Sequence, residues 1–479
     1  MSSNHPEMMW SYPNPMLDYM PEAAKYAKAK AMLSVNRSCP GLHYPDVLAP
    51  WGVSESSDGL AADAGLMSNG PYSTMPIVWL WEYGDRENKT EILERYFPLV
   101  KGETDFFSCF LTLNASDGYL HDLHDCTNES PGLCPSSDTV MTLSMMRRCF
   151  DVVSDMAAFV GAPVDPKWAA TLAKVVPDPV IWFHVDTRFW SYRMGNVSHE
   201  CGFCSGARGP PKGHRPPTAG DCQATSQNGG NMQGDVCARS VSGACPKGMG
   251  PCSQQGYAAV GNTGNGHPGA ISGGNSQSCF PVFPADAVGT NSSASGAGAA
   301  TVIDAEMWAQ GNSFTKAYSA AARVVAPGLL NASMVYQNWK STFTAQSQPN
   351  GIPMNPFSGF ETVGATEYVN YMHLQSDPAG FLGLFEAMPA GMSASFTRLR
   401  GRGAFIVSSS ITKGVVGGTT LVSNRGETCV IRRPQSWSKA AVKVVAEGSP
   451  VEVRWEGAAD AEFFSFLTTK GQTYTLTGV

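Results

Sequence analysis

The amino-acid sequence predicts a mainly α-helical protein that ends in a small β-sandwich. Residues 1 to about 195 contain helical patterns joined by long loops. Residues 200 to about 260 are rich in Cys, Gly and Pro and have almost no periodicity, which indicates an insertion. From about residue 386, polar and apolar side chains alternate between glycine turns, which is typical of β-strands. We therefore expect a helical domain over 1–385, with an insert at about 200–260, and a β-sandwich over 386–479.

The helical domain is predicted from segments in which apolar residues recur with a helical period. In 88–113 this period is clear, and Pro98 is expected to kink the helix or divide it. The clearest pattern is 136–161, where Ser or Asp at 136–138 can cap the start and Gly161 can end the helix. Further helices are expected over 22–33, 165–176, 301–330 and 361–376.

The composition limits the possible partners. The chain has 479 residues and a net charge of −7, and only 15% of its residues are charged. It has no basic stripe, so nucleic acid is not an expected partner. Neutral sugars and peptides fit this weakly acidic chain better than anionic polymers do. No apolar run has the length of a membrane span, and no GxSxG, HExxH or Walker motif is present.

The expected location follows from two opposed features. The N-terminal stretch lacks the basic and apolar regions of a signal peptide, which taken alone favours the cytoplasm. Thirteen cysteines and seven N-x-S/T acceptor triplets favour secretion or the cell surface. The two features agree if the chain is the mature part of a longer precursor. The acceptor residues are Asn36, Asn88, Asn114, Asn128, Asn196, Asn291 and Asn331.

The cysteines of the insert suggest disulfides rather than a metal. Cys201 and Cys204 have a zinc-like spacing, but no second pair or His pair with finger spacing follows them. We therefore expect a disulfide-stapled insert and no metal, with the pairing of its six cysteines left open. The odd total of thirteen leaves at least one thiol free or paired outside the chain.

A family resemblance is carried by the segment 354–434. It contains an acidic residue in a Gly/Phe-rich turn, a helix ending in LQS, an LFxAxP-like strand and an LRxRGxF motif that opens the β module. This segment resembles the end of a glycoside hydrolase of the family 95 type, which includes α-L-fucosidases and related α-L-galactosidases. The stretches SSNHPE, GYLHDLHDCTNES and DTVMTLSMMRRCF fit more loosely. The resemblance spans about two-thirds of the chain and is specific over 351–433.

The resemblance implies an (α/α)6 barrel and an inverting exo-glycosidase that removes terminal deoxy- or L-sugars without a cofactor. Such enzymes use an acid and a base about 6.5–9.5 Å apart. The acid position matches Glu129 in CTNESPG. The base position matches Glu361 in SGFETVG, where the family more commonly has Asp.

Two departures from the family lead to an alternative function. The segment that would hold the family's Asn pair lies before residue 1, so a separate segment or chain would have to supply it. Glu129 also belongs to the acceptor triplet of Asn128, where a glycan would obstruct a pocket. The alternative is an inactive glycosidase-fold glycoprotein that self-assembles in an extracellular matrix or filament.

Each remaining candidate residue has a functional and a structural interpretation. Asp122 and His124 can contact sugar hydroxyls, bind a metal together with His121 and Asp125, or form hydrogen bonds within their loop. Glu129 can be a solvated loop carboxylate, and Glu361 can be a charge at a helix N-terminus. His184 and Arg188 can form a pocket wall or a buried polar network. Trp308 can be a platform for a sugar or a core residue.

Overall fold

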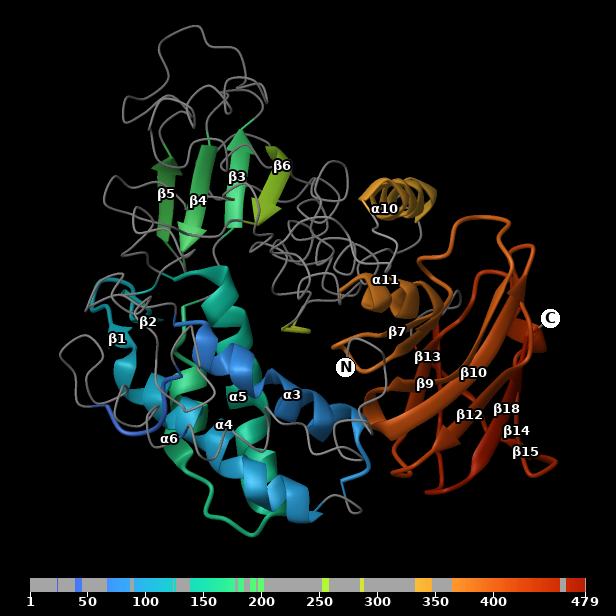
Figure 1. Cartoon of the computed structure of the whole chain (residues 1–479), viewed down its shortest axis with the longest axis horizontal. Coiled ribbons are helices and arrows are strands. Elements are labelled where there is room, and N and C mark those ends of the chain that lie inside the picture. The colour runs from blue at the N-terminus through green and yellow to red at the C-terminus, as the bar shows by residue number, and fades with distance from the viewer. Residues whose placement is uncertain are drawn as a thin grey trace, which may run out of the picture.

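The structure is a computed structural model that describes two main regions of the chain (Figure 1). For 180–184, 190–194, 197–201 and 252–257 it describes only the backbone. The predicted helices over 22–33, apart from Ala24, and over 301–330 lie outside the described residues. The described residues are 24, 39–44, 67–86, 90–123, 125, 138–176, 180–184, 190–194, 197–201, 252–257, 285–287, 332–346, 364–456 and 462–478.

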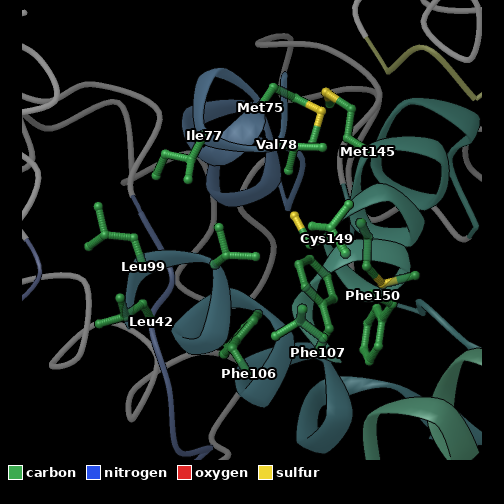
Figure 2. Packing of buried hydrophobic residues seen from close by; sticks show 14 of the residues in the cluster. Leu42, Met75, Ile77, Val78, Leu99, Phe106, Phe107, Met145, Cys149 and Phe150 are labelled. Atoms are coloured by element: carbon green, nitrogen blue, oxygen red, sulfur yellow. The ribbon is translucent and has the colours of Figure 1, made fainter. Parts of the chain in front are cut away.

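Helices α3 to α6 form the helical unit on one side of Figure 1. They span Asn69–Tyr83, Thr90–Phe110, Val140–Phe159 and Pro166–Leu172. Helices α3, α4 and α5 pack against one another around one hydrophobic core. Figure 2 shows side chains of these three helices meeting there, among them Met75, Val78, Phe106, Phe107, Met145 and Cys149.

The predicted helices of this unit are confirmed, with two differences of detail. Pro98 lies inside α4, which continues through it as one helix, and its exposed position keeps the ring away from the core. Gly161 follows the end of α5 with a positive φ of 71°, a conformation that favours glycine. The start of α5 is capped by Thr139, not by a residue at 136–138.

Helix α3 has no counterpart among the predicted helices. Pro71 and Pro76 interrupt its sequence, and ten of its fifteen residues are buried. A helix that is buried on most sides has no polar face, so it lacks the amphipathic period that identifies a surface helix.

The segment 39–44 is fixed to α4 by a disulfide and a close backbone approach. Cys39 is bonded to Cys109, and the Leu42 N–H donates to the Gly102 carbonyl at 2.9 Å. A Cβ on Gly41 would lie 2.3 Å from the Gly102 oxygen, and a Cβ on Gly102 would lie 2.4 Å from the Leu42 side chain. Both glycines are therefore required for this contact.

An antiparallel sheet in the order β5-β4-β3-β6 frames the insert. Its strands are Val180–His184, Trp190–Met194, Val197–Cys201 and Cys252–Tyr257 for β3 to β6. This corrects the expectation that residues up to about 195 are helical. It also shows that both ends of the insert, at Cys201 and Cys252, belong to one sheet. Strands β5 and β6 are separated by β4 and β3, so these two cysteines lie on opposite edges and are too far apart to be bonded to each other.

The C-terminal β module consists of two sheets around a shared core. One sheet has the order β11-β10-β12-β18-β14-β15, with β9 paired to β10, and the other has the order β16-β17-β13-β8-β7. Both sheets contribute to the same hydrophobic cluster, which is a sandwich arrangement. Alternating burial along β12 and β18 confirms the predicted period of two. The strands are β7 Leu374–Ser376, β8 Leu382–Leu384, β9 Ala394–Gly401, β10 Phe405–Thr412, β11 Val415–Val416, β12 Thr419–Ser423, β13 Cys429–Arg432, β14 Lys443–Ala446, β15 Ser449–Val451, β16 Arg454–Glu456, β17 Phe463–Phe466 and β18 Thr473–Thr477.

The segment before the β module differs from its predicted form. Helix α10 spans Ala332–Gln346, and α11 spans Gly364–His373. The LQS motif does not end this helix but forms β7, which pairs with β8. Strand β8 in turn pairs with β13, so the five-stranded sheet includes chain that precedes residue 386. The (α/α)6 arrangement stays a prediction, because it involves residues outside those described.

Arg402 joins the β module to the helical unit. It lies in the LRxRGxF motif, in the short 3-10 turn Arg402–Ala404, and its guanidinium reaches Glu82 of α3 at 3.1 Å and Asp286 at 2.5 Å. Glu82 also pairs with Arg148 of α5, and the Tyr83 hydroxyl donates to Asp286 at 2.9 Å. The motif that opens the β module thus contributes Arg402 to a largely buried ion-pair network.

Arg425 makes the second connection between the two regions. Its guanidinium donates to the carbonyls of Gly84 at 2.9 Å and Glu82 at 3.0 Å, and also to that of Trp81. These carbonyls belong to the C-terminal end of α3, where the helix dipole favours a positive charge. The β module therefore caps a helix of its neighbour.

Candidate functional site

The candidate site lies where the β1–β2 hairpin meets the start of α5. Strand β1 (Thr112–Leu113) pairs with β2 (Leu120–His121), and the turn between them includes Gly118 with a φ of 79°. Leu120 also bridges to Val175, just beyond α6, which fixes the hairpin to the helical unit. This arrangement places His121 at the end of β2, where the chain continues toward α5.

His121 lies between two carboxylates. Its Nδ1 is 2.7 Å from Asp138 Oδ2, and its Nε2 is 3.0 Å from Asp117 Oδ2. His121 is 4% exposed and Asp138 is fully buried. Because both ring nitrogens face carboxylates, the doubly protonated imidazolium can donate to both at once.

The surroundings shift the pKa values of these three groups. Burial alone would lower the pKa of His121, but the hydrogen bond and charge of Asp138, with those of Asp117, raise it. Burial raises the pKa of Asp138, although His121 offsets part of this effect. The pKa of Asp117 is lowered despite its desolvation, because the Tyr119 N–H and His121 stabilise the carboxylate.

A second set of hydrogen bonds joins the two ends of the loop. The Asp138 N–H donates to the Asp122 carbonyl at 2.8 Å, and the Asp122 N–H donates to Asp138 Oδ1 at 2.9 Å. The Thr139 hydroxyl donates to Asp125 Oδ2 at 2.5 Å, and Asp125 Oδ1 accepts the Met67 N–H at 3.0 Å. We call this group, made of Asp117, His121, Asp122, Asp125, Asp138 and Thr139, the loop anchor.

The backbone of Asp138 adapts to the loop anchor. Its φ is 52°, in the left-handed region that Asp tolerates better than most residues. In this conformation its carboxylate faces His121 and the Asp122 N–H instead of capping α5. Thr139 takes the capping role, since its hydroxyl oxygen accepts the Thr142 N–H at 3.3 Å.

A second polar group is buried among the helices. Glu103 of α4 is fully buried, and a Cβ on Gly70 of α3 would lie 2.2 Å from its Oε2. Burial raises the pKa of Glu103 well above its usual value, and the Tyr44 backbone amide offsets only part of this. The same surroundings raise the pKa of the Cys149 thiol, whose sulfur lies 3.2 Å from the Thr74 hydroxyl.

The structure describes few of the candidate residues that the sequence indicated. Asp122 is fully buried, and its backbone belongs to the loop anchor. His184 lies in β3 opposite Cys252, as a backbone position only. Trp81 is a core residue that contacts Phe159 edge to face. The residues outside the described part of the chain are His124, Glu129, Arg188, Trp308, Glu361 and all the acceptor asparagines except Asn114.

Sequence reasoning missed the roles of Asp117 and Asp138. Asp138 was interpreted only as a possible helix cap, and Asp117 was given no individual role. The available signal was the spacing of Asp117 and His121, four residues apart in a polar turn. Within the described ranges, no group of three or more His, Cys, Asp or Glu is arranged to hold a metal ion.

Comparisons with known proteins give distant structural similarities only. No family model matches the chain, and no curated protein matches it. A solved structure described as "Putative kojibiose phosphorylase from human microbiome" superimposes with a TM-score of 0.46 and 10% sequence identity. The match covers 87% of this chain and 51% of that chain, so the chain spans about half the length of that protein. This similarity is too distant to assign a fold or an activity.

Proposed function

We propose that the chain belongs to an inverting exo-glycosidase of the α-L-fucosidase type, with Glu129 as acid and Glu361 as base. The resemblance over 351–433 supports this proposal, and so does the weakly acidic chain, which suits a neutral sugar. The proposed substrate is a terminal deoxy- or L-sugar of a glycan. No cofactor is needed, because both proton transfers use side chains of the protein.

The loop anchor is the observation that carries the proposal. The chain between Asp125 and Asp138 contains Glu129, and both of its ends are fixed by buried hydrogen bonds. A general acid must be held close to its productive position, because a small displacement costs a large part of the rate. A buried network that fixes both ends of one segment fits a segment whose position matters.

The proposed proton transfers use the two carboxyl groups and water. Glu129 starts protonated and donates its proton to the glycosidic oxygen as the bond to the sugar breaks. Glu361 starts ionised and takes a proton from the water that attacks the opposite face of the sugar. The released sugar therefore has the inverted anomeric configuration.

Hydrolysis of an aryl α-L-fucoside tests this function. The full chain is expected to release the β anomer first, as followed by NMR, and Glu129→Gln and Glu361→Gln are each expected to lower kcat by about a hundredfold or more. Glu94→Gln is the matched control, because Glu94 is an exposed glutamate on α4. A folded wild-type chain without turnover would contradict the proposal and favour the inactive assembly glycoprotein.

An extracellular location is part of the same proposal. The disulfide between Cys39 and Cys109 supports an oxidising compartment. Among the described residues, the helices are all too short or too polar to cross a membrane. Peptide mapping of the protein isolated without reductant tests the location, since a reduced Cys39 would contradict it.

A further inference from the structure

The β1–β2 turn presents a glycan acceptor to solvent. Asn114, Ala115 and Ser116 form an N-x-S triplet, and all three residues are exposed. The backbone on both sides of the triplet is fixed, because the Asn114 N–H donates to the Tyr119 carbonyl at 2.9 Å and the Gly118 N–H donates to the Asn114 carbonyl at 2.8 Å. The side chain of Asn114 is thus displayed at the tip of a hydrogen-bonded hairpin.

The side chains of the triplet are already in contact. The Ser116 hydroxyl donates to Asn114 Oδ1 at 2.8 Å, and the Ser116 N–H donates to the same oxygen at 3.0 Å. Glycosylation at N-x-S/T requires a hydroxyl two residues after the asparagine, and here that hydroxyl is next to the acceptor amide.

The turn can keep its hydrogen bonds after modification. Asn114 Nδ2 donates to Asp117 Oδ2 at 3.3 Å, and a glycosylated amide nitrogen retains one N–H for this bond. Asn114 Oδ1 is not altered by the reaction, so its two contacts with Ser116 remain. Leu113, the preceding residue, is 55% exposed, and a sugar on Asn114 would cover part of this apolar surface.

We propose that Asn114 carries an N-linked glycan. In the transfer, the bond between Asn114 Nδ2 and the sugar C1 forms as the bond from C1 to a lipid diphosphate breaks. The diphosphate leaves with the electron pair, and Nδ2 loses one proton. The co-reactant is a lipid-diphosphate oligosaccharide of the secretory compartment, the same kind of compartment that supports the Cys39–Cys109 disulfide.

Peptide mapping tests the modification. The full chain is secreted from a eukaryotic host and treated with peptide N-glycosidase in heavy-oxygen water, which converts each glycosylated Asn into labelled Asp. We expect the label on Asn114 in most copies. Secreted wild-type protein without label at Asn114 would overturn the proposal, whether or not other asparagines are labelled.

Two variants at Ser116 provide a matched pair. Ser116→Thr keeps the hydroxyl and should keep the label on Asn114, whereas Ser116→Ala should lose it. A label on Asn114 that persists in Ser116→Ala would contradict the assigned role of the hydroxyl. None of these outcomes depends on turnover of a sugar, so this proposal and the proposed glycosidase can fail separately.

Discussion

The helical unit and the β module bury their charged groups in different ways. In the loop anchor, the helical unit buries carboxylates that accept hydrogen bonds from backbone N–H groups, Thr139 and His121, although the same unit also holds the Glu82–Arg148 ion pair. The β module contains a compact ion pair, in which Arg432 Nη1 lies 3.0 Å from Glu386 Oε2 and its guanidinium lies over the rings of Phe381 and Phe463. Burial still raises the pKa of Glu386 to about 7, in spite of the charge of Arg432.

The proposed function gives a role to the buried carboxylates of the loop anchor, whereas the ion pair belongs to the packing of the β module. Buried carboxylates with shifted pKa values destabilise a fold unless they are fully paired, so a concentration of them indicates a role beyond stability. The ion pair of the β module joins Glu386, in the turn after β8, to Arg432 of β13. The following predictions test the contrast between the two regions, from the largest expected effect to the smallest.

The disulfide should stabilise the helical unit alone. Cys39 and Cys109 are 70 residues apart, and closing a loop of this length stabilises a fold by about 4 kcal/mol. Cys39→Ala/Cys109→Ala should therefore lower the unfolding midpoint of the helical unit and leave that of the β module in place. Differential scanning calorimetry measures this. Addition of reductant should shift the wild type but not the variant, and an equal shift in both would contradict the assignment.

The ion pair of the β module should be costly to break and easy to replace. Arg432→Met leaves Glu386 buried without its partner, which should destabilise the β module by about 3 kcal/mol. Arg432→Met/Glu386→Met replaces both charges with apolar side chains and should recover most of this loss. Urea unfolding of the two variants measures the difference. A double variant as unstable as the single one would show that the pair does more than fill the core.

Arg402 should couple the two regions. Its loss leaves Glu82 with Arg148 alone and Asp286 without its guanidinium, so Arg402→Met should destabilise the protein by about 2 kcal/mol. The two calorimetric transitions should also move further apart. Arg454→Met is the control, because Arg454 is 65% exposed and should change stability by less than about 0.5 kcal/mol. An unchanged separation between the two transitions in Arg402→Met would refute the coupling.

Glu103 should make the helical unit less stable as the pH rises. Its pKa is raised in the folded state, so above about pH 4.3 the unfolded chain releases this proton before the folded chain does. Relative to Glu103→Gln, the wild type should lose up to about 1.4 kcal/mol per pH unit until the folded carboxyl ionises. Urea unfolding at several pH values measures this difference. A constant difference between the two proteins would mean that Glu103 is ionised in the fold.

Sequence reasoning was more successful where burial is one-sided. In β18, Tyr474 and Leu476 are buried between exposed threonines, so the alternation is visible in the sequence. Helix α5 ends near Gly161 as predicted, because a positive φ favours glycine at that position. Helix α3 was missed because most of its faces are buried, which removes the periodic signal.

The candidate site could be predicted only in part, because its partners are set by the fold. The polar character of the loop from Asp117 to Asp125 was evident, but the pairing of His121 with Asp138 depends on how the loop returns to α5. The bond between Cys39 and Cys109 could not be predicted from the sequence either, since thirteen cysteines allow many pairings. Arg402 stood in a recognised motif, yet its partners Glu82 and Asp286 lie more than 100 residues away.

The central claim is that the loop anchor positions the chain that carries Glu129. Its most direct test is turnover of an aryl α-L-fucoside by His121→Gln across a range of pH, with His373→Gln as a matched histidine control. Because the pKa of His121 is raised, its two hydrogen bonds are complete at low pH and weaken as the pH rises through that pKa. We predict that wild-type kcat falls as the pH rises through the pKa of His121. In folded His121→Gln, kcat should be about a hundredfold lower, and the part of the alkaline fall that follows His121 should be absent, which leaves only the fall due to ionisation of Glu129. A folded His121→Gln variant with the wild-type kcat and pH profile would contradict the claim.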